Sequence, residues 1–334
     1  MKPVILAAGL GTGLPENLPS AVPRLPVGLP DRRSGFVRLY RKGKARSRLV
    51  AQFQQLPGAY HTYSRYLEHG KEMAKQSGER LGLTSQSTPN DTLRLSIAAP
   101  AYNEEAGIRH VVDSWIAFLR KSSDIGDFEI VVCNDGSDDN TGEILRELAK
   151  ANPELRMVDF TQNLGAAVAL TAAIKATLLD WVLLIDSDGQ FPIENLSLLL
   201  SVLRRDETSA AIGIRKKKDT TFRRFGTWSS GIACNLIYGT RLKDFNSACK
   251  LVSGPLIRSL NLEAKGMNSS TEITGKLLEA GIDIMEVEIV HRPRTSGASS
   301  MRLVKDSIHR LLFVCYLGFR LLLIQLGVLQ QPLK

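Results

Sequence analysis

The chain has 334 residues, 43% of them hydrophobic, which is enough to bury a full core in one large domain with appendages. Its formal net charge is +9. Eight basic residues lie in the acid-free stretch 32–48, and nine minus eight leaves about +1 for the remainder. The positive charge is therefore local. No recognisable nucleic-acid-binding motif accompanies it, so we expect no nucleic-acid partner.

The first 90 residues are rich in glycine and proline and then become basic, and we expect them to form a partly flexible N-terminal extension. Lys2 precedes only a short apolar run, which does not predict a signal peptide. Within the basic stretch, Phe36, Leu39 and Tyr40 lie between the charges. Such a pattern could bind anionic lipid headgroups or form a solvated linker, and both interpretations stay open.

Four cysteines, Cys133, Cys234, Cys249 and Cys315, lie in the rest of the chain. Their spacing contains neither a C-x-x-C pair nor a metal-binding pattern. We therefore expect each to be a small buried hydrophobic residue in a reducing compartment.

Beyond residue 91, short β-rich runs alternate with helix-length amphipathic segments. We predict strands at 94–99, 128–133, 155–160, 181–186, 209–214 and 284–290, with helices at 104–121, 140–150, 165–178 and 193–205. This order predicts an α/β, Rossmann-like fold in which helices flank a mostly parallel sheet. Ligands of such sheets bind at the carboxyl ends of the strands, so the loops there should carry the chemistry.

The first two predicted strands are followed by PAYNEEAGI (100–108) and NDGSDDNTG (134–142). Neither loop has the glycines of a dinucleotide-binding fingerprint, which disfavours a nicotinamide-dependent dehydrogenase. Asp135, at the end of its strand, could accept hydrogen bonds from a base edge or a ribose hydroxyl. The alternative is a helix start rich in capping residues, and this loop alone does not separate the two.

The fourth predicted strand, WVLLID, leads into SDGQFP. Because side chains alternate faces along a strand, Asp186 and Asp188 are expected to point the same way, with Gln190 two residues further on. Two carboxylates and an amide oxygen at a carboxyl end suit a hard divalent cation that binds diphosphate. A solvated acidic turn is the weaker interpretation, because the preceding strand is entirely apolar.

The segments PAYNEE, NDGSDDNT, NLGAAVALTAAI and IDSDGQFP, in this order and spacing, resemble glycosyltransferase family 2, whose members have the GT-A fold. The most similar branch is that of dolichol-phosphate mannose synthase and bacterial polyprenyl-phosphate glycosyltransferases. IRKKKD, NLIYGTRLKDFNSACKLV, TEI and HRPRTSGASS agree with it. The resemblance covers about 91–300, and its motifs are specific in combination.

The resemblance implies roles for the matching positions. Asp186, Asp188 and Gln190 would hold Mg²⁺ or Mn²⁺ on the donor diphosphate, and Asp135 would recognise the nucleotide base. Arg215 and Arg294 would contact phosphate charge beside Asp188 in the reaction centre. The remaining substrate-binding positions would be Pro100, Tyr102, Asn103, Glu104, Asn163, Gly165 and Ser299, the last in an R-x-x-G-x-S acceptor loop. Ser300 stands where family members often have lysine, so one expected phosphate contact is in doubt.

The implied function is an inverting transfer of a sugar from a UDP- or GDP-sugar to a polyprenyl phosphate such as dolichyl or undecaprenyl phosphate. This acceptor is already an anion and needs no general base. A hydroxyl acceptor on a glycan or lipid would need one, and Glu272 in NSSTEI is the candidate. The spacing from Ser269 to Glu272 also predicts a capping box at a helix start, the interpretation we favour. A non-catalytic membrane scaffold is disfavoured by the intact D-x-D-x-Q.

The two ends of the chain raise separate questions. MKPVILAAGLGTGLP resembles the start of a sugar-nucleotide pyrophosphorylase, but Gly13 and Pro23-Arg24 depart from that pattern and the resemblance stops near residue 30. We expect no such activity. Within the C-terminal segment 301–334, the apolar run 311–329 carries Arg320 near its middle. It could form a marginal membrane span, an interfacial helix or a helix packed on the catalytic domain. The first two imply work at the cytoplasmic face of a membrane.

Overall fold

The computed structural model describes residues 92–206, 208–215, 221–265, 268–293, 303–325 and 328–329. The chain divides into two compact units, Met1–Tyr63 and Ser64–Lys334, and every described residue belongs to the second. The basic stretch 32–48 and the pyrophosphorylase-like start therefore lie outside the described residues. The domain boundaries expected at 90/91 and 300/301 stay predictions.

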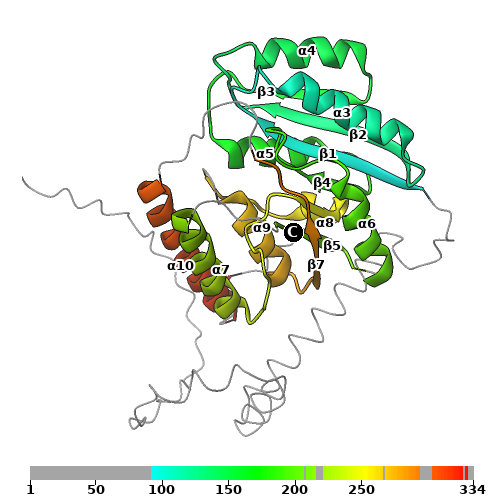
Figure 1. Cartoon of the computed structure of the whole chain (residues 1–334). Coiled ribbons are helices and arrows are strands. Elements are labelled where there is room, and N and C mark those ends of the chain that lie inside the picture. The colour runs from blue at the N-terminus through cyan, green and yellow to red at the C-terminus, as the bar shows by residue number, and fades with distance from the viewer. Residues whose placement is uncertain are drawn as a thin grey trace, which may run out of the picture. The chain divides into compact units, whose positions relative to one another are not determined.

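The described part of the chain is built on one seven-stranded sheet (Figure 1). In spatial order the strands are β3 (Leu155–Asp159), β2 (Ile125–Asn134), β1 (Leu93–Ala101), β4 (Trp181–Leu184), β6 (Lys250–Ser253), β5 (Ala210–Arg215) and β7 (Ile284–Ile289). Strand β6 is antiparallel to both of its neighbours, and the other pairs are parallel. The mostly parallel sheet is confirmed, and six of its strands are the predicted ones.

Strand β6 was not predicted. Its sequence, KLVS, has four residues and begins with a lysine, yet all four are buried. A run this short has no readable period. Because β6 runs backwards between β4 and β5, those two strands point the same way, and the carboxyl ends of the other six strands share one edge of the sheet.

Helices follow most of the strands. They are α3 (Ile108–Lys121), α4 (Thr141–Ala151), α5 (Ala166–Ala176), α6 (Asn195–Asp206), α7 (Thr221–Tyr238), α8 (Gly254–Ser259), α9 (Ser269–Glu279) and α10 (Leu303–Gln325). The first four confirm the predicted helices, although α3 starts four residues later than expected. Helix α10 is the predicted C-terminal hydrophobic helix, whereas α7 and α8 were not predicted.

Side chains from the two faces of the sheet form two hydrophobic cores. Ile97 and Leu183 point to the face covered by α3, α4 and α6. Their neighbours Ala98 and Leu184 point to the opposite face, where α5, α8 and α9 supply Ala169, Ile257 and Ile273 among others. This alternation is what a sheet buried on both faces requires, and it leaves the strand ends free to carry loops.

Helix α10 packs against α7 and α9 (Figure 1). Val314 meets Cys234 of α7 and Phe245 in a small separate core. Arg320, the charge in the apolar run, is buried and donates to Glu279 of α9. Of the helices described by the structure, none is long and apolar enough to count as a candidate membrane span.

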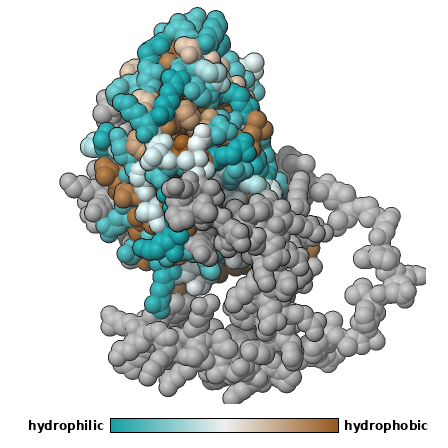
Figure 2. Space-filling model, turned by 90° about the vertical axis from the view of Figure 1, so that its right-hand side faces the viewer, coloured by the Kyte–Doolittle hydropathy of each residue, from teal (hydrophilic) through white to brown (hydrophobic). Residues whose placement is uncertain are grey.

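The outer side of this helix pair is apolar. Large hydrophobic side chains are exposed there at Leu236 of α7 and at Leu311, Leu312, Phe319 and Leu322 of α10. Cys315 of α10 is also exposed, so the expectation that all four cysteines are buried is wrong for this one. The other three are buried, and all four are free thiols. By contrast, the coloured residues on the side seen in Figure 2 are mostly hydrophilic.

Candidate active site

The loops that follow β1 and β2 are bonded to each other. Asn103 donates its backbone N–H to Ser137 Oγ at 3.1 Å, and its side-chain Oδ1 accepts the N–H of Asp138 at 2.9 Å. Tyr102 donates its hydroxyl to Asp138 at 3.1 Å. Asn103 has a φ of 54°, a left-handed conformation that asparagine tolerates better than most residues. The predicted substrate-binding residues of the first loop thus lie directly beside the second.

Glu104 and Glu105 complete this junction. The N–H of Glu104 donates to Thr141 Oγ1 at 2.8 Å, and the N–H of Glu105 donates to Asp139 at 3.1 Å. The Glu105 carboxylate in turn accepts the backbone and side-chain N–H groups of Asn140. Thr141 begins α4. The polar residues of both loops therefore satisfy one another's backbone groups, as the capping interpretation expected in part.

Asp135 connects the second loop to the third. Its carboxylate accepts the N–H of Leu164 at 2.8 Å and that of Gly165 at 2.9 Å, and its residue is only 1% exposed. Burial raises the pKa of Asp135, while these two N–H donors oppose the rise. Asp135 thus holds the loop before α5, which contains the predicted donor-pocket residues Asn163 and Gly165.

Gly136 allows the backbone of the second loop to approach the backbone of the loop before α5. Its φ is +62°, and a Cβ built there would lie 2.2 Å from the carbonyl carbon of Gln162. No side chain fits in that space. The three loops after β1, β2 and β3 consequently form one continuous surface at the carboxyl edge of the sheet.

The D-x-D-x-Q segment lies in the loop after β4. The strand ends at Leu184, so the prediction that Asp186 and Asp188 extend from a strand with alternating side chains is wrong. A turn orders them instead, with Gly189 at a φ of +73° and Asp188 Oδ1 accepting the N–H of Gln190 at 3.0 Å. Ser187 donates to the carbonyl of Pro100 at 2.7 Å, which ties this loop to the end of β1.

Gln190 also contacts the segment that follows β7. Its backbone carbonyl accepts the N–H of Arg292 at 2.8 Å, and its Nε2 donates to the Arg292 carbonyl at 3.3 Å. Residues 294–302, which follow Pro293, are not among the described residues. Arg294 and Ser299, the predicted acceptor-loop residues, lie outside the described residues.

Arg215, at the carboxyl end of β5, is held by a residue of the segment NLIYGTRLKDFNSACKLV to which the resemblance gave no role. Its guanidinium donates to both carboxylate oxygens of Asp244, at 2.8 and 2.9 Å, and Asp244 is 1% exposed. Glu286 of β7 accepts the N–H groups of Lys243 and Asp244. The aspartate lies 29 residues from Arg215, so no local pattern could have paired them.

Lys250 is a second group that the sequence did not reveal. It begins β6, is fully buried and donates to the carbonyl of Ser247. Burial lowers its pKa to about 7, against the opposing effect of the Asp244 charge. The segment CKLV shows that a lysine is present, but nothing in its pattern predicts that this side chain is fully buried.

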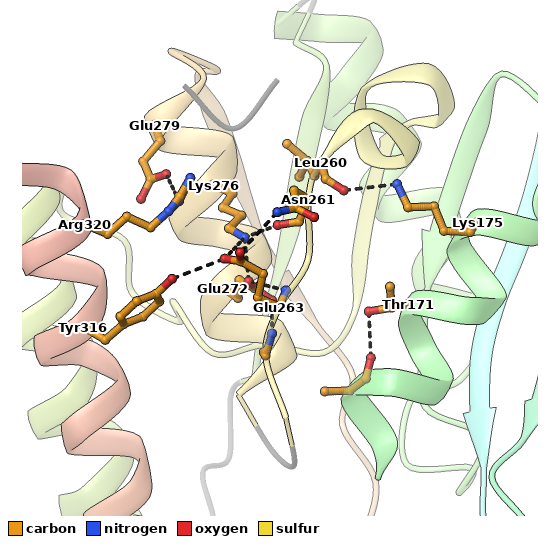
Figure 3. A network of polar contacts seen from close by, with 12 residues as sticks. Thr171, Lys175, Leu260, Asn261, Glu263, Glu272, Lys276, Glu279, Tyr316 and Arg320 are labelled. Atoms are coloured by element: carbon orange, nitrogen blue, oxygen red, sulfur yellow. Dashed lines mark hydrogen bonds and ion pairs between the residues drawn. The ribbon is translucent and has the colours of Figure 1, made fainter. Parts of the chain in front are cut away.

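Glu272 lies in the first turn of α9, within the polar network drawn in Figure 3. Its two oxygens accept the N–H groups of Glu263 at 2.7 Å and Ala264 at 2.9 Å. It also pairs with Lys276 at 2.7 Å, and both side chains are buried. A helix does begin at Ser269, but its N-cap is Asn268 and no side chain caps it. The capping box is therefore wrong, because Glu272 caps a neighbouring loop instead.

The loops after β1 to β4, the end of β5 and the segment after β7 all lie at the carboxyl edge of the sheet. Asp188 Oδ2 and Gln190 Oε1 accept no hydrogen bond within the part of the chain that the structure describes. Nor do three His, Cys, Asp or Glu side chains gather there into a metal-holding group. Two carboxylates and an amide still offer the oxygen atoms that Mg²⁺ and Mn²⁺ prefer, with water and phosphate completing the shell.

Comparison with solved structures identifies the architecture as a GT-A fold. Glucosyl-3-phosphoglycerate synthase of Mycobacterium tuberculosis, crystallised with Mn²⁺, uridine diphosphate and phosphoglyceric acid, matches with a TM-score of 0.51 and 20% identity. The match covers 71% of this chain and 80% of that one. At this identity the likeness concerns the fold alone.

The family model of glycosyl transferase family 2 matches residues 96–256. A dolichyl-phosphate beta-glucosyltransferase, ALG5C of Trichomonas vaginalis, is 35% identical over 31% of this chain and 32% of its own length. The dodecaprenyl-phosphate galacturonate synthase of Rhizobium johnstonii is 24% identical over 68% of this chain and 69% of its own. The chain thus covers about a third of the first relative. The family resemblance is confirmed.

Proposed function

We propose that this protein is an inverting glycosyltransferase that moves a sugar from a nucleotide-sugar donor to a polyprenyl phosphate. The observation that carries this proposal is the pairing of Gln190 with Arg292. It joins the loop with the predicted metal ligands to the first residues of HRPRTSGASS (291–300). The names of the two relatives, both of which refer to a polyprenyl phosphate, support the choice of acceptor.

In the proposed reaction an oxygen of the acceptor phosphate attacks the anomeric carbon of the sugar. The bond from that carbon to the donor phosphate breaks, and its electron pair leaves with the nucleoside diphosphate. A divalent cation held by Asp186, Asp188 and Gln190 would supply neutralisation of the charge on this leaving group. Asp135 fixes the loop that would shape the donor pocket, and the Arg215 guanidinium, oriented by Asp244, would contact phosphate at the same edge.

The second candidate is transfer to a hydroxyl group, which requires a general base. Glu272 accepts two N–H groups and pairs with a buried lysine. Both carboxylate oxygens are therefore engaged in holding the loop and the lysine. This structural use of Glu272 supports the phosphate acceptor, because an anionic nucleophile has no proton to give up and needs no base.

For the location of the protein, we propose attachment to the cytoplasmic face of a membrane through the apolar side of α7 and α10. Leu311, Leu312 and Phe319 are each more than half exposed, and such contiguous apolar surface is uncommon on a protein with no partner. Arg320 points inward to Glu279, so the exposed side of the helix is free of that charge. A lipid-linked acceptor would be reached from this surface.

The proposal is tested with a panel of UDP- and GDP-sugars, Mn²⁺ or Mg²⁺, and undecaprenyl or dolichyl phosphate, followed by mass analysis of the lipid product. Asp188→Ala should reduce transfer more than tenfold, in keeping with about 2–4 kcal/mol of charge stabilisation. Asp180→Ala is the matched control, since this exposed carboxylate precedes the same strand at its other end. More than a tenth of wild-type activity in Asp188→Ala, with unchanged metal dependence, would contradict the metal assignment.

A paired experiment separates the two acceptors. Arg294→Lys should lose most transfer to polyprenyl phosphate while donor binding stays near normal, because a lysine cannot reproduce the paired hydrogen bonds of a guanidinium. Glu272→Gln should be mild by comparison. If Glu272→Gln abolishes transfer and Arg294→Lys does not, the acceptor is a hydroxyl group.

A further inference from the structure

Asn195, the first residue of α6, uses both polar atoms of its side-chain amide in hydrogen bonds to a single residue, Val290, which follows β7. Its Nδ2 donates to the carbonyl of Val290 at 2.8 Å, and its Oδ1 accepts the N–H of Val290 at 3.0 Å. Asn195 is 2% exposed. Two hydrogen bonds from one buried amide fix both the distance and the orientation of the chain that they contact.

The location of Val290 explains why such a contact is needed. The pairing of β5 with β7 ends at Arg215 and Ile289, so Val290 is the first residue beyond the sheet. Val290 itself is 54% exposed, so the buried partner is the amide of Asn195, which would lack hydrogen bonds without the N–H and C=O of Val290. The amide of Asn195 takes the place of a further strand.

Two more contacts continue the same junction toward the D-x-D-x-Q loop. The rings of Phe191 and His291 meet edge to face, with centroids 4.9 Å apart, and Gln190 pairs with Arg292. The segment 290–292 is thus fastened along its length to 190–195. One side of it continues from the strand next to Arg215, and the other adjoins the predicted metal ligands.

From this arrangement we infer that Asn195 is a positioning residue for the transfer reaction. It acts through the backbone of Val290 and sets the segment 290–292 at a fixed place between Arg215 and the D-x-D-x-Q loop. The inference rests on the proposed function, in which the acceptor phosphate must approach the donor between these two groups. Small displacements of such a segment should weaken productive binding of the acceptor without abolishing binding of the donor.

The test compares Asn195→Ala, which removes both hydrogen bonds, with Asn195→Asp, which keeps an acceptor for the Val290 N–H but loses the donor. We expect the KM for polyprenyl phosphate to rise about tenfold in Asn195→Ala, with the dissociation constant for the nucleoside diphosphate and Mn²⁺ changed less than about threefold. Asn195→Asp should lie between this variant and the wild type. Amide hydrogen exchange at Val290 should be faster in Asn195→Ala, which removes the acceptor of this N–H, and nearly unchanged in Asn195→Asp, which keeps it.

Asn152→Ala is the matched control, because Asn152 also donates its Nδ2 to a backbone carbonyl, that of Leu148, at the far end of α4. It should lower stability without changing the acceptor KM. An unchanged acceptor KM in Asn195→Ala, or an equal loss of donor affinity, would overturn the inference. Absence of product from the wild type would instead refute the proposed function, and slow exchange at Val290 in Asn195→Ala would refute the contact itself.

Discussion

Arg320 of α10 donates to Glu279 of α9 at 3.1 Å, and the side chain of Glu279 is completely buried. Tyr238 of α7 donates to the other oxygen of the same carboxylate at 2.9 Å. One buried carboxylate therefore joins three helices, and the charge that interrupts the C-terminal apolar run is what attaches that run to the domain (Figure 3).

Removal of one partner of this pair should be costly. We expect Arg320→Leu to lower the free energy of unfolding by about 3 kcal/mol or more, because it leaves a buried carboxylate without its cation. Urea unfolding provides the measurement. Arg109→Leu, which breaks an exposed pair with Glu147, is the control and should cost less than about 1 kcal/mol. Equal losses in the two variants would show that the buried pair does not hold α10.

Gly136 should tolerate no side chain. Its positive φ and the 2.2 Å approach to Gln162 predict that Gly136→Ala loses about 2 kcal/mol or more of unfolding free energy. A shift of the loop that contains Asn163 should also raise the KM for the donor. Gly231→Ala provides the comparison, since a Cβ at that position of α7 meets nothing within 4 Å and removal of a helical glycine stabilises by up to about 1 kcal/mol. Similar behaviour of the two variants would contradict the close approach.

The four thiols should differ in reactivity. Burial raises the pKa of Cys133 and of Cys249 to about 12, and Cys234 is buried, whereas Cys315 is exposed. N-ethylmaleimide should therefore label Cys315 alone in the folded protein, as peptide mass analysis can show. If the apolar side of α10 binds membranes, anionic vesicles should slow this labelling. An unchanged rate on protein that sediments with the vesicles would place the membrane contact elsewhere.

Glu129 should make stability depend on pH in the acid range. Burial opposes its ionisation, but hydrogen bonds from Ser96, Leu178 and Arg156 outweigh burial and hold its pKa below the ordinary 4.5. Since the folded-state pKa is the lower one, the stabilisation is complete above the unfolded-state pKa and is lost as the pH falls through the folded-state value. Between about pH 5 and pH 3, the wild type should lose stability more steeply than Glu129→Gln in urea titrations. Parallel curves would assign the acid sensitivity to other groups.

Much of this fold could be predicted because the local sequence of most strands and helices has the hydrophobic pattern of its element. WVLLID and FEIVVC are too apolar to lie anywhere but in a buried sheet, and the polar loops that follow them mark its carboxyl edge. The turn around Asp188 was harder to foresee. The apolar run predicts a strand through Asp186, but the strand ends at Leu184. Beyond it, the positive φ of Gly189 forms a turn that sets the direction of the chain.

The supporting residues of the site were beyond prediction for a different reason. Asn195 meets Val290 across 95 residues, and Glu272 binds a loop that precedes its own helix. The local sequence explains Asn195 as a residue at a helix start and Glu272 as part of a capping box. Neither explanation predicts the contact that the residue makes in the folded protein. The role of such polar residues depends on partners that only the tertiary structure brings close, so it cannot be predicted from the local sequence.

The backward strand β6 has a consequence for how such proteins diversify. It separates the block β3-β2-β1-β4, whose loops contain the predicted donor-binding motifs, from the pair β5-β7, which carries Arg215 and is followed by the segment 290–292. If the proposed function holds, we expect substitutions at the β5-β7 end of the sheet to change which acceptor is used. Substitutions in the loops of the other block should instead change which nucleotide sugar is bound.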